Sequence, residues 1–243
     1  MLKLKVIEPS HSAWASTVVI VPKKKGKARF CVDYRRLNNI TKKDAYPLPR
    51  MEDCLDSLRD AKVFTSLECT AGYWKVSIRP VDREKTAFTT HSGIYDWLSM
   101  PFGLTNAPAT FQRAIDIKLS GLKWQPCLVY LDDVIIFSAC AEQHVKDVNV
   151  VFTRLREASG TLNLEKCTWF SDEVEYLGNI VRPGQLHVHN KIFDALKHAS
   201  FPTTKTQLKS FLGMLNVYRR FVKDFAKRPK LLNAMSRAET PPD

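Results

Sequence analysis

The chain has 243 residues, of which 44% are hydrophobic and 26% charged, and it carries a formal net charge of +12. This balance is typical of a globular protein with one large or two small domains and excludes an intrinsically disordered chain. The positive excess favours a polyanionic partner, most simply nucleic acid. An anionic membrane surface is the alternative, but the sequence shows no apolar run of membrane-spanning length and no signal-peptide core. We therefore expect an intracellular protein without a membrane partner.

Cysteine and histidine show no pattern typical of a metal site. The six cysteines are scattered without a Cys-x-x-Cys pair, which argues against structural zinc and favours reduced thiols. His187 and His189 come nearest to a metal pair, and their spacing places them on one face of a surface strand.

The N-terminal part predicts a strand over residues 14–21, ended by Pro22, and a second strand over 28–34. The turn between the two strands holds four lysines. Lysines at a turn are usually only solvated, but here Asp33 is the sole acid between Pro22 and Lys43. We therefore favour a phosphate-binding surface on this hairpin over a merely solvated one.

The central part predicts short strands and helices, from proline positions and from apolar spacings of two, three and four. The expected elements are an extended segment at 46–49, a helix at 51–58, a strand at 63–67, a turn or short helix that becomes a strand over 72–78, a hairpin of 85–90 with 94–98, a loop at 100–106 and a helix at 107–119.

Residues 127–137 consist of two apolar runs of strand length on either side of Asp132 and Asp133. A two-residue polar interruption between such runs predicts a tight hairpin with both carboxylates at its tip. Adjacent carboxylates repel unless a cation lies near them, and oxygen ligands suit Mg²⁺. From this stretch alone, a solvated Asp-Asp turn and a metal site are equally acceptable interpretations.

The C-terminal part predicts a helix over 144–155, strands over 167–170 and 175–181, and only helices beyond residue 190. The apolar face of the first helix consists of Val145, Val148, Val151, Phe152 and Leu155. A later stripe consists of Ile192, Ala195, Leu196 and Ala199. Thr204 and Gln207 have the spacing of a capping box that begins the last helix. The chain is thus expected to be α+β with a helical C-terminal subdomain.

A series of motifs runs in order along nearly the whole chain. They are Trp14-Ala15-Ser16, Val21-Pro22-Lys23-Lys24, Arg29 to Asn38, Ala45 to Arg50, Lys85 to Thr90, Met100 to Leu104, Asn106 to Arg113, Tyr130-Leu131-Asp132-Asp133, Tyr176-Leu177-Gly178, Phe211-Leu212-Gly213 and Tyr218 to Phe221. Together they closely resemble the reverse transcriptase domain of gypsy-type long-terminal-repeat retrotransposon polyproteins.

The resemblance implies a right-hand polymerase with fingers, palm and thumb, an antiparallel palm sheet and a helical C-terminal thumb. The fingers are expected at 1–42, truncated at the N-terminus, and at 76–106. The palm is expected at 43–75 and 107–183, and the thumb and connection helices at 184–243. A fragment of a longer polyprotein is expected.

The resemblance also implies an RNA-directed DNA polymerase that takes an RNA or DNA template with a primer and deoxynucleoside triphosphates. A homodimer or a polyprotein is the expected context, in a cytoplasmic particle or the nucleus. Glu68, Asp132 and Asp133 fall at the positions that hold two Mg²⁺ ions, with Mn²⁺ as the alternative. Lys166 matches a lysine that protonates pyrophosphate, although a plain surface lysine is nearly as good an interpretation.

The other implied site residues surround the nucleotide and the primer. Lys24 and Arg29 fall at triphosphate-binding positions and Phe102 in the nucleotide-pocket loop. Tyr73 falls at the aromatic gate that excludes a ribose 2′-hydroxyl, with core packing as its alternative. Leu177 and Gly178 match the primer-grip turn, and Arg219 and Arg220 belong to the basic thumb that follows the nucleic-acid backbone.

One departure from the family's pattern concerns the third carboxylate. The family's Phe-x-x-Leu-Asp-Leu reads Phe64 to Cys69 here, with Glu68 in place of the aspartate. Its carboxylate is one methylene, roughly 1.5 Å, farther from the backbone, and Mg²⁺ demands near-ideal octahedral geometry. We therefore predict a polymerase that is severely impaired or inactive with Mg²⁺. The alternatives are a nucleic-acid-binding relic of the same fold and an RNA-dependent RNA polymerase, against which Tyr73 argues.

Overall fold

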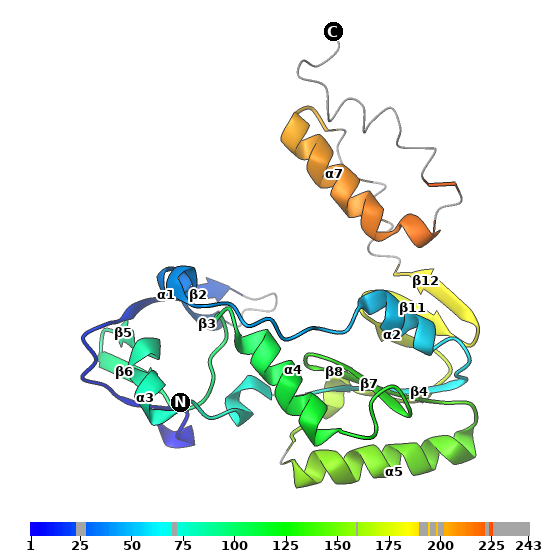
Figure 1. Ribbon diagram of the computed structural model, residues 1–243, viewed down its shortest axis with the longest axis horizontal. Helices are drawn as coiled ribbons and strands as arrows, with labels where there is room; N and C mark the ends of the chain where they lie inside the picture. Colours follow the sequence, from blue (N-terminus) through cyan, green and yellow to red (C-terminus); the bar gives the residue numbers. More distant parts are fainter. Residues whose placement is uncertain are drawn as a thin grey trace.

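The computed structural model describes residues 1–22, 28–69, 72–158, 160–189, 194, 198, 202–221, 224 and 225. Lys24 and the predicted stripe at Ile192, Ala195, Leu196 and Ala199 lie outside the described residues. Figure 1 shows the first sheet with α1 and α3 at one end, the two other sheets with α2, α4 and α5 at the other, and α7 standing apart from both.

The first sheet contains the predicted basic hairpin. Its strand order is β1-β6-β5-β2-β3, and every pair is antiparallel except β2 with β5. The elements of this region are η1 (Leu2–Leu4), β1 (Ile7–Pro9), β2 (Ser16–Pro22), β3 (Ala28–Val32), α1 (Arg35–Ile40), α3 (Pro80–Arg83), η3 (Glu84–Thr86), β5 (Phe88–Thr90) and β6 (Gly93–Trp97). Its core is built around Tyr34, Phe88 and Trp97 and includes Val32 of β3, so the hairpin is packed against this core at the end away from its turn.

The second sheet holds the Asp-Asp hairpin. Its order is β7-β8-β4-β9, antiparallel throughout. The elements are α2 (Met51–Ser57), β4 (Val63–Glu68), η2 (Gly72–Lys75), α4 (Ala107–Lys118), β7 (Cys127–Tyr130), β8 (Asp133–Ser138), α5 (Ala141–Glu157), η4 (Leu164–Lys166) and β9 (Thr168–Ser171).

Both faces of this second sheet are covered. Val129 and Val134 belong to a core cluster with residues of α4 and α5, whereas Leu128 and Ile135 belong to another with residues of α2. Successive side chains of a strand point to opposite faces, so a strand buried on both sides appears in the sequence as an uninterrupted apolar run. The hairpin is consequently fixed from both sides.

A third sheet, β10-β11-β12, and helix α7 follow. Their bounds are β10 (Val174–Tyr176), β11 (Asn179–Arg182), β12 (Gln185–Val188), α7 (Lys205–Val217) and η5 (Arg219–Phe221). The predicted capping box is confirmed, since the Thr204 side chain accepts from the Gln207 backbone and the Gln207 side chain reaches back to the Thr204 backbone. Within the described part of the chain, no helix is both long and apolar enough to cross a membrane.

Three of the predicted strands differ from the structure. Residues 175–181 form two strands with a turn between them, because Leu177 and Gly178 both have positive φ, 49° and 73°, as a two-residue hairpin turn requires. The strand expected up to residue 78 is reduced to a single bridge between Ser77 and Ser99. Residues 84–86 form η3, so the strand expected from residue 85 begins only at Phe88.

The predicted apolar face of α5 was wrong at its first position. Val145 is 54% exposed, whereas the neighbouring His144 is fully buried. The His144 ring fits between two strands, with Nε2 2.8 Å from the Thr65 hydroxyl and Nδ1 2.9 Å from the Ser138 hydroxyl. Because both nitrogens have partners, burying this polar ring leaves no unpaired group.

Candidate active site

The hairpin that carries the two predicted aspartates is shifted by one residue from the expected position. Tyr130 pairs directly with Asp133, the first residue of β8, so the turn consists of Leu131 and Asp132. The expectation that both carboxylates lie at the tip was therefore wrong. Leu131 has φ 54°, a left-handed conformation that costs an ordinary side chain about 1–2 kcal/mol, so surrounding contacts must hold the turn.

Glu68 lies beside this hairpin. As the last residue of β4 it pairs directly with Asp133, and directly opposed residues point to the same face of a sheet. The backbone N–H of Cys69 donates to the carbonyl of Asp132 at 3.0 Å. The sheet thus brings together the three carboxylates that the sequence predicted. The Glu68 side chain itself pairs with Lys166, whose Nζ lies 2.5 Å from Oε1.

The electrostatics of this cluster show a shortage of positive charge. Burial raises the pKa of Asp132, and the charges of Asp133 and Glu68 raise it further. Burial and then Glu68 raise the pKa of Asp133, while Lys166 lowers it. Oδ1 of Asp132 is buried and has no hydrogen-bond partner among the described residues. A buried oxygen without a donor is costly, so this corner of the site suits a cation.

The carboxylates do not form a ready-made metal cluster. Among the residues that the structure describes, no three His, Cys, Asp or Glu side chains are gathered closely enough to hold an ion. Glu68 contacts the ammonium group of Lys166 instead. A set of three ligands therefore requires a rearrangement of these side chains.

An aromatic wall stands next to Asp132. A Cβ on Gly72 would lie 2.6 Å from Cζ of Phe111 and 3.1 Å from Oδ1 of Asp132, so only glycine fits there. The Tyr73 ring is 8% exposed and meets Phe111 and Phe102 edge-on, with centroids 5.1 and 4.9 Å away. Burial, and then the charge of Asp132, raise the pKa of Tyr73. Held between two rings, Tyr73 can act as a fixed barrier.

Gln112 is a residue of this site that the sequence reasoning missed. It is fully buried on α4; its Oε1 accepts from the Leu131 backbone N–H at 2.8 Å, and its Nε2 donates to the Val129 carbonyl at 3.1 Å. Nε2 also donates to Oδ1 of Asp116 at 2.9 Å. The available signal was a polar residue on the helix face that carries Phe111 and Ile115.

The remaining predicted site residues that the structure describes lie on other elements. Lys24 is outside the described residues, and Arg29 is exposed on β3. Leu177 and Gly178 form the β10–β11 turn. Arg219 lies in η5, 3.8 Å from Glu52 of α2. Of Arg220, only its place in η5 is described.

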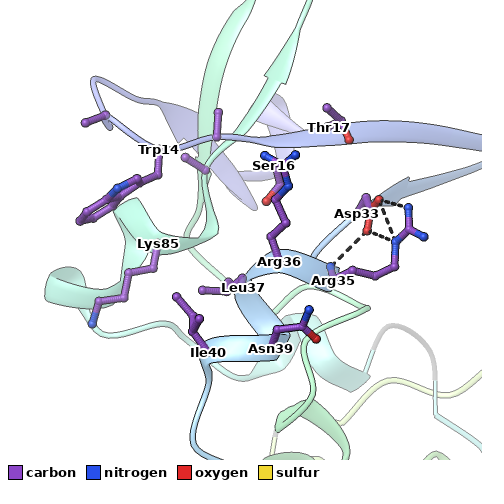
Figure 2. Close-up of a pocket in the computed structure, with 13 residues that line it drawn as sticks. Trp14, Ser16, Thr17, Asp33, Arg35, Arg36, Leu37, Asn39, Ile40 and Lys85 are labelled. Carbon is purple, nitrogen blue, oxygen red and sulfur yellow. Dashed lines mark hydrogen bonds and ion pairs between the residues drawn. The ribbon is translucent and has the colours of Figure 1, made fainter.

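A cavity of about 1020 Å³ opens on the first sheet, away from the carboxylates, between the start of β2, α1 and η3 (Figure 2). Trp14 lies on one side, Arg36 points towards Ser16, and Asp33 is bound by Arg35 through the hydrogen bonds drawn in the figure. These hydrogen bonds lower the pKa of Asp33 to about 2. None of the residues predicted for catalysis or nucleotide binding lines the described part of this cavity.

The chain is similar to known proteins over most of its length. The family described as Reverse transcriptase (RNA-dependent DNA polymerase) matches residues 21–181. The chain belongs to this family. Over 96% of its length, this reverse transcriptase domain is 40% identical to the retrovirus-related Pol polyprotein from transposon opus of Drosophila melanogaster. It is 38% identical, over 93% of its length, to the retrovirus-related Pol polyprotein from transposon gypsy of the same organism. It is 33% identical, over 91% of its length, to the Tf2-3 polyprotein of Schizosaccharomyces pombe.

The reverse transcriptase domain spans only 24%, 22% and 17% of these three polyproteins. Its fold is similar to the foamy viral protease-reverse transcriptase solved with double-stranded DNA, with a TM-score of 0.90 and 27% identity over 99% of this chain and 42% of that one. For the same viral protein solved with an RNA/DNA hybrid, the TM-score is 0.82 with 27% identity, over 98% of this chain and 32% of that one. The predicted α+β right-hand polymerase fold is confirmed.

Proposed function

We propose that this domain is an RNA-directed DNA polymerase that adds deoxynucleotides to a primer on an RNA or DNA template. The observation that carries the proposal is the position of Glu68, Asp132 and Asp133. Glu68 and Asp133 face each other at neighbouring strand ends, and Asp132 lies in the adjoining turn. Within the described part of the chain, its buried Oδ1 has no hydrogen-bond donor, and it lies beside the aromatic wall that includes Tyr73. The net charge of +12 and the nucleic acids in the related viral structures support such a partner.

The donor set fits divalent metal ions. All three side chains offer only carboxylate oxygens, which Mg²⁺ and Mn²⁺ prefer. Oδ1 of Asp132, which has no hydrogen-bond partner among the described residues, is available for one ion. Glu68, Asp132 and Asp133 would hold two Mg²⁺ ions, or Mn²⁺ as the alternative, once Glu68 leaves Lys166. Two ions at such a site supply an activated primer 3′-hydroxyl and a stabilised leaving pyrophosphate.

The other residues bind and select the nucleotide. Phe102 rests against Tyr73 and is 52% exposed, so it presents a flat apolar surface to a nucleotide. Tyr73 cannot move aside, because Phe111 supports it from behind, and it would collide with a 2′-hydroxyl. Lys24 and Arg29 would bind the triphosphate, as cations placed against developing negative charge. Lys166 would donate a proton to pyrophosphate after it releases Glu68.

Nucleic acid would lie across the exposed basic residues. We propose that the Leu177-Gly178 turn contacts the primer and that Arg219 and Arg220 follow the backbone without reading sequence. The proposed fingers comprise 1–42 and 76–106, the palm 43–75 and 107–183, and the thumb the residues from 184 on. A polyprotein or a homodimer, in a cytoplasmic particle or the nucleus, is the proposed context.

A second candidate function is a nucleic-acid-binding relic that no longer polymerises. The observation that favours it is the Glu68–Lys166 ion pair, which occupies the third carboxylate with a cation of the protein itself. Relic and polymerase share the fold and the basic surface. They differ only in whether the three carboxylates assemble around metal ions.

The test is extension of a DNA primer on an RNA template, with Mg²⁺ and with Mn²⁺, and with Asp132→Asn as the blank. Extension above the blank with either ion supports the polymerase. Template-primer binding with no extension in either ion supports the relic. Preferred incorporation of ribonucleotides would overturn both in favour of an RNA polymerase.

A further inference from the structure

One polar side chain of helix α4, Gln112, hydrogen-bonds the backbone of the hairpin that carries the two aspartates. Gln112 is fully buried, and both ends of its amide contact the hairpin backbone: Oε1 accepts from Leu131 and Nε2 donates to the carbonyl of Val129. The two backbone groups flank Tyr130, and Leu131 directly precedes the turn residue Asp132. One amide thus fixes the backbone immediately before the metal-binding carboxylate.

The conformation of the turn explains why such a fixing contact is needed. Leu131 is the first turn residue and has φ 54°, a position at which hairpin turns prefer glycine or asparagine. On the far side, the carbonyl of Asp132 accepts from the N–H of Cys69. The Asp132 backbone is therefore held on one side by β4 and on the other by Gln112, through Leu131.

The orientation of the Gln112 amide is itself determined. Nε2 donates to Oδ1 of Asp116 one helical turn away, while Oδ2 of Asp116 accepts from Tyr46 and Lys123. A carboxylate can only accept hydrogen bonds from these groups, so Nε2 must face Asp116 and Oε1 must face Leu131. These contacts allow the Gln112 amide only one orientation.

We propose that Gln112 is a positioning residue for the metal-binding carboxylates: it holds the Leu131–Asp132 turn in the backbone conformation that aims Asp132 at the metal. The proposal rests on the proposed function for its catalytic meaning. Mutation of a residue that orients a metal ligand commonly lowers metal affinity or activity by about 10- to 100-fold. We expect a substitution of Gln112 to have an effect in this range.

The experiment compares Gln112→Met with Gln143→Met as the matched control. Gln143 is an exposed glutamine of α5 whose amide bonds Asp147, at the Ser138 end of the sheet. Mn²⁺ binding is measured by electron paramagnetic resonance, and exchange of the Leu131 amide by NMR on protein labelled with ¹⁵N-leucine. Val32→Ala, in the core of the first sheet, controls for general loss of stability.

We expect Gln112→Met to weaken Mn²⁺ binding by about 10- to 100-fold and to speed Leu131 exchange by at least about tenfold. Gln143→Met and Val32→Ala should change neither the Mn²⁺ affinity nor the exchange rate of the Leu131 amide. Equal Mn²⁺ affinity and equal exchange in Gln112→Met and wild type would overturn the proposal.

The experiment still tests the proposal if the wild type binds no Mn²⁺ or if the variant does not fold. If wild type binds no Mn²⁺, the proposed function fails, and exchange of the Leu131 amide still decides whether Gln112 holds the turn. If Gln112→Met does not fold, the wild-type protein is sufficient: its Leu131 amide should exchange at least about tenfold more slowly than an unstructured amide. A Leu131 amide that exchanges at the unprotected rate overturns the proposal.

Discussion

Replacing Glu68 by aspartate should increase polymerisation with Mg²⁺. The substitution shortens the side chain by one methylene, roughly 1.5 Å, at the strand position directly opposite Asp133. It also lengthens the ion pair with Lys166, now 2.5 Å, to about 4 Å if the backbone stays in place. The carboxylate is thereby drawn back towards the aspartates and away from its competing partner.

The expected gain is about a hundredfold in the single-turnover rate, because a misplacement of about 1 Å at a reacting centre costs about that much. Stability should hardly change. Both members of the ion pair are substantially exposed, Lys166 at 57% and Glu68 at 35%, and such pairs contribute about 0–1 kcal/mol. A large rate change at constant stability would therefore locate the effect in the site.

The assay is single-nucleotide primer extension under single-turnover conditions, with Mg²⁺ and Mn²⁺ titrated separately. Glu165→Asp is the matched control, since it makes the same change in an exposed glutamate next to Lys166. Asp132→Asn gives the background. Equal rates for wild type and Glu68→Asp with Mg²⁺ would refute the reasoning that the extra methylene misplaces the carboxylate.

Three further predictions concern Gly72, Tyr73 and His144. Gly72→Ala should cost about 1–3 kcal/mol of unfolding free energy in urea titrations, because its Cβ meets Phe111; Gly213→Ala in α7, where the Cβ meets nothing, should not destabilise. Tyr73→Val should raise the use of ribonucleotides relative to deoxynucleotides by about 10- to 100-fold in competitive extension, as loss of a clash of about 1–3 kcal/mol implies, and an unchanged ratio would contradict the gate. Burial lowers the pKa of His144 below its ordinary 6.5. As the pH falls, the imidazole therefore takes up a proton at a higher pH in the unfolded state than in the folded state. Stability should then fall as the pH drops below about 6.5, by at most about 1.4 kcal/mol per pH unit, and a His144→Gln variant whose urea midpoint shows the same pH slope would contradict this.

The sequence predicted local features where neighbouring residues decide the outcome. The Thr204–Gln207 capping box was confirmed because both its hydrogen bonds close within one helical turn. The hairpin at Asp132 was predicted for the same reason, because the two apolar runs that form it are neighbours in the chain. Family motifs supplied what local patterns lack, the grouping of Glu68 with two aspartates more than sixty residues later in the chain.

Predictions failed where distant partners determine a residue's position. His144 replaced Val145 in the core because Thr65, 79 residues away, offers its hydroxyl. The turn moved by one residue because strand register pairs Tyr130 with Asp133, although the polarity of the two aspartates favoured a turn at that pair. Neither the contact from Thr65 nor this register can be inferred from residue spacing within one segment.

The Glu68–Lys166 pair links two roles that the family motifs treat as separate. Its members are 98 residues apart and meet through Oε1 of Glu68 and Nζ of Lys166. The closed pair therefore keeps this oxygen from a metal and the ammonium group from pyrophosphate. Under the proposed function, binding of metal by Glu68 and release of Lys166 as a proton donor are therefore one event. A variant at Lys166 would change metal affinity and proton donation together. The two effects separate only when metal binding is measured without nucleotide, where proton donation plays no part.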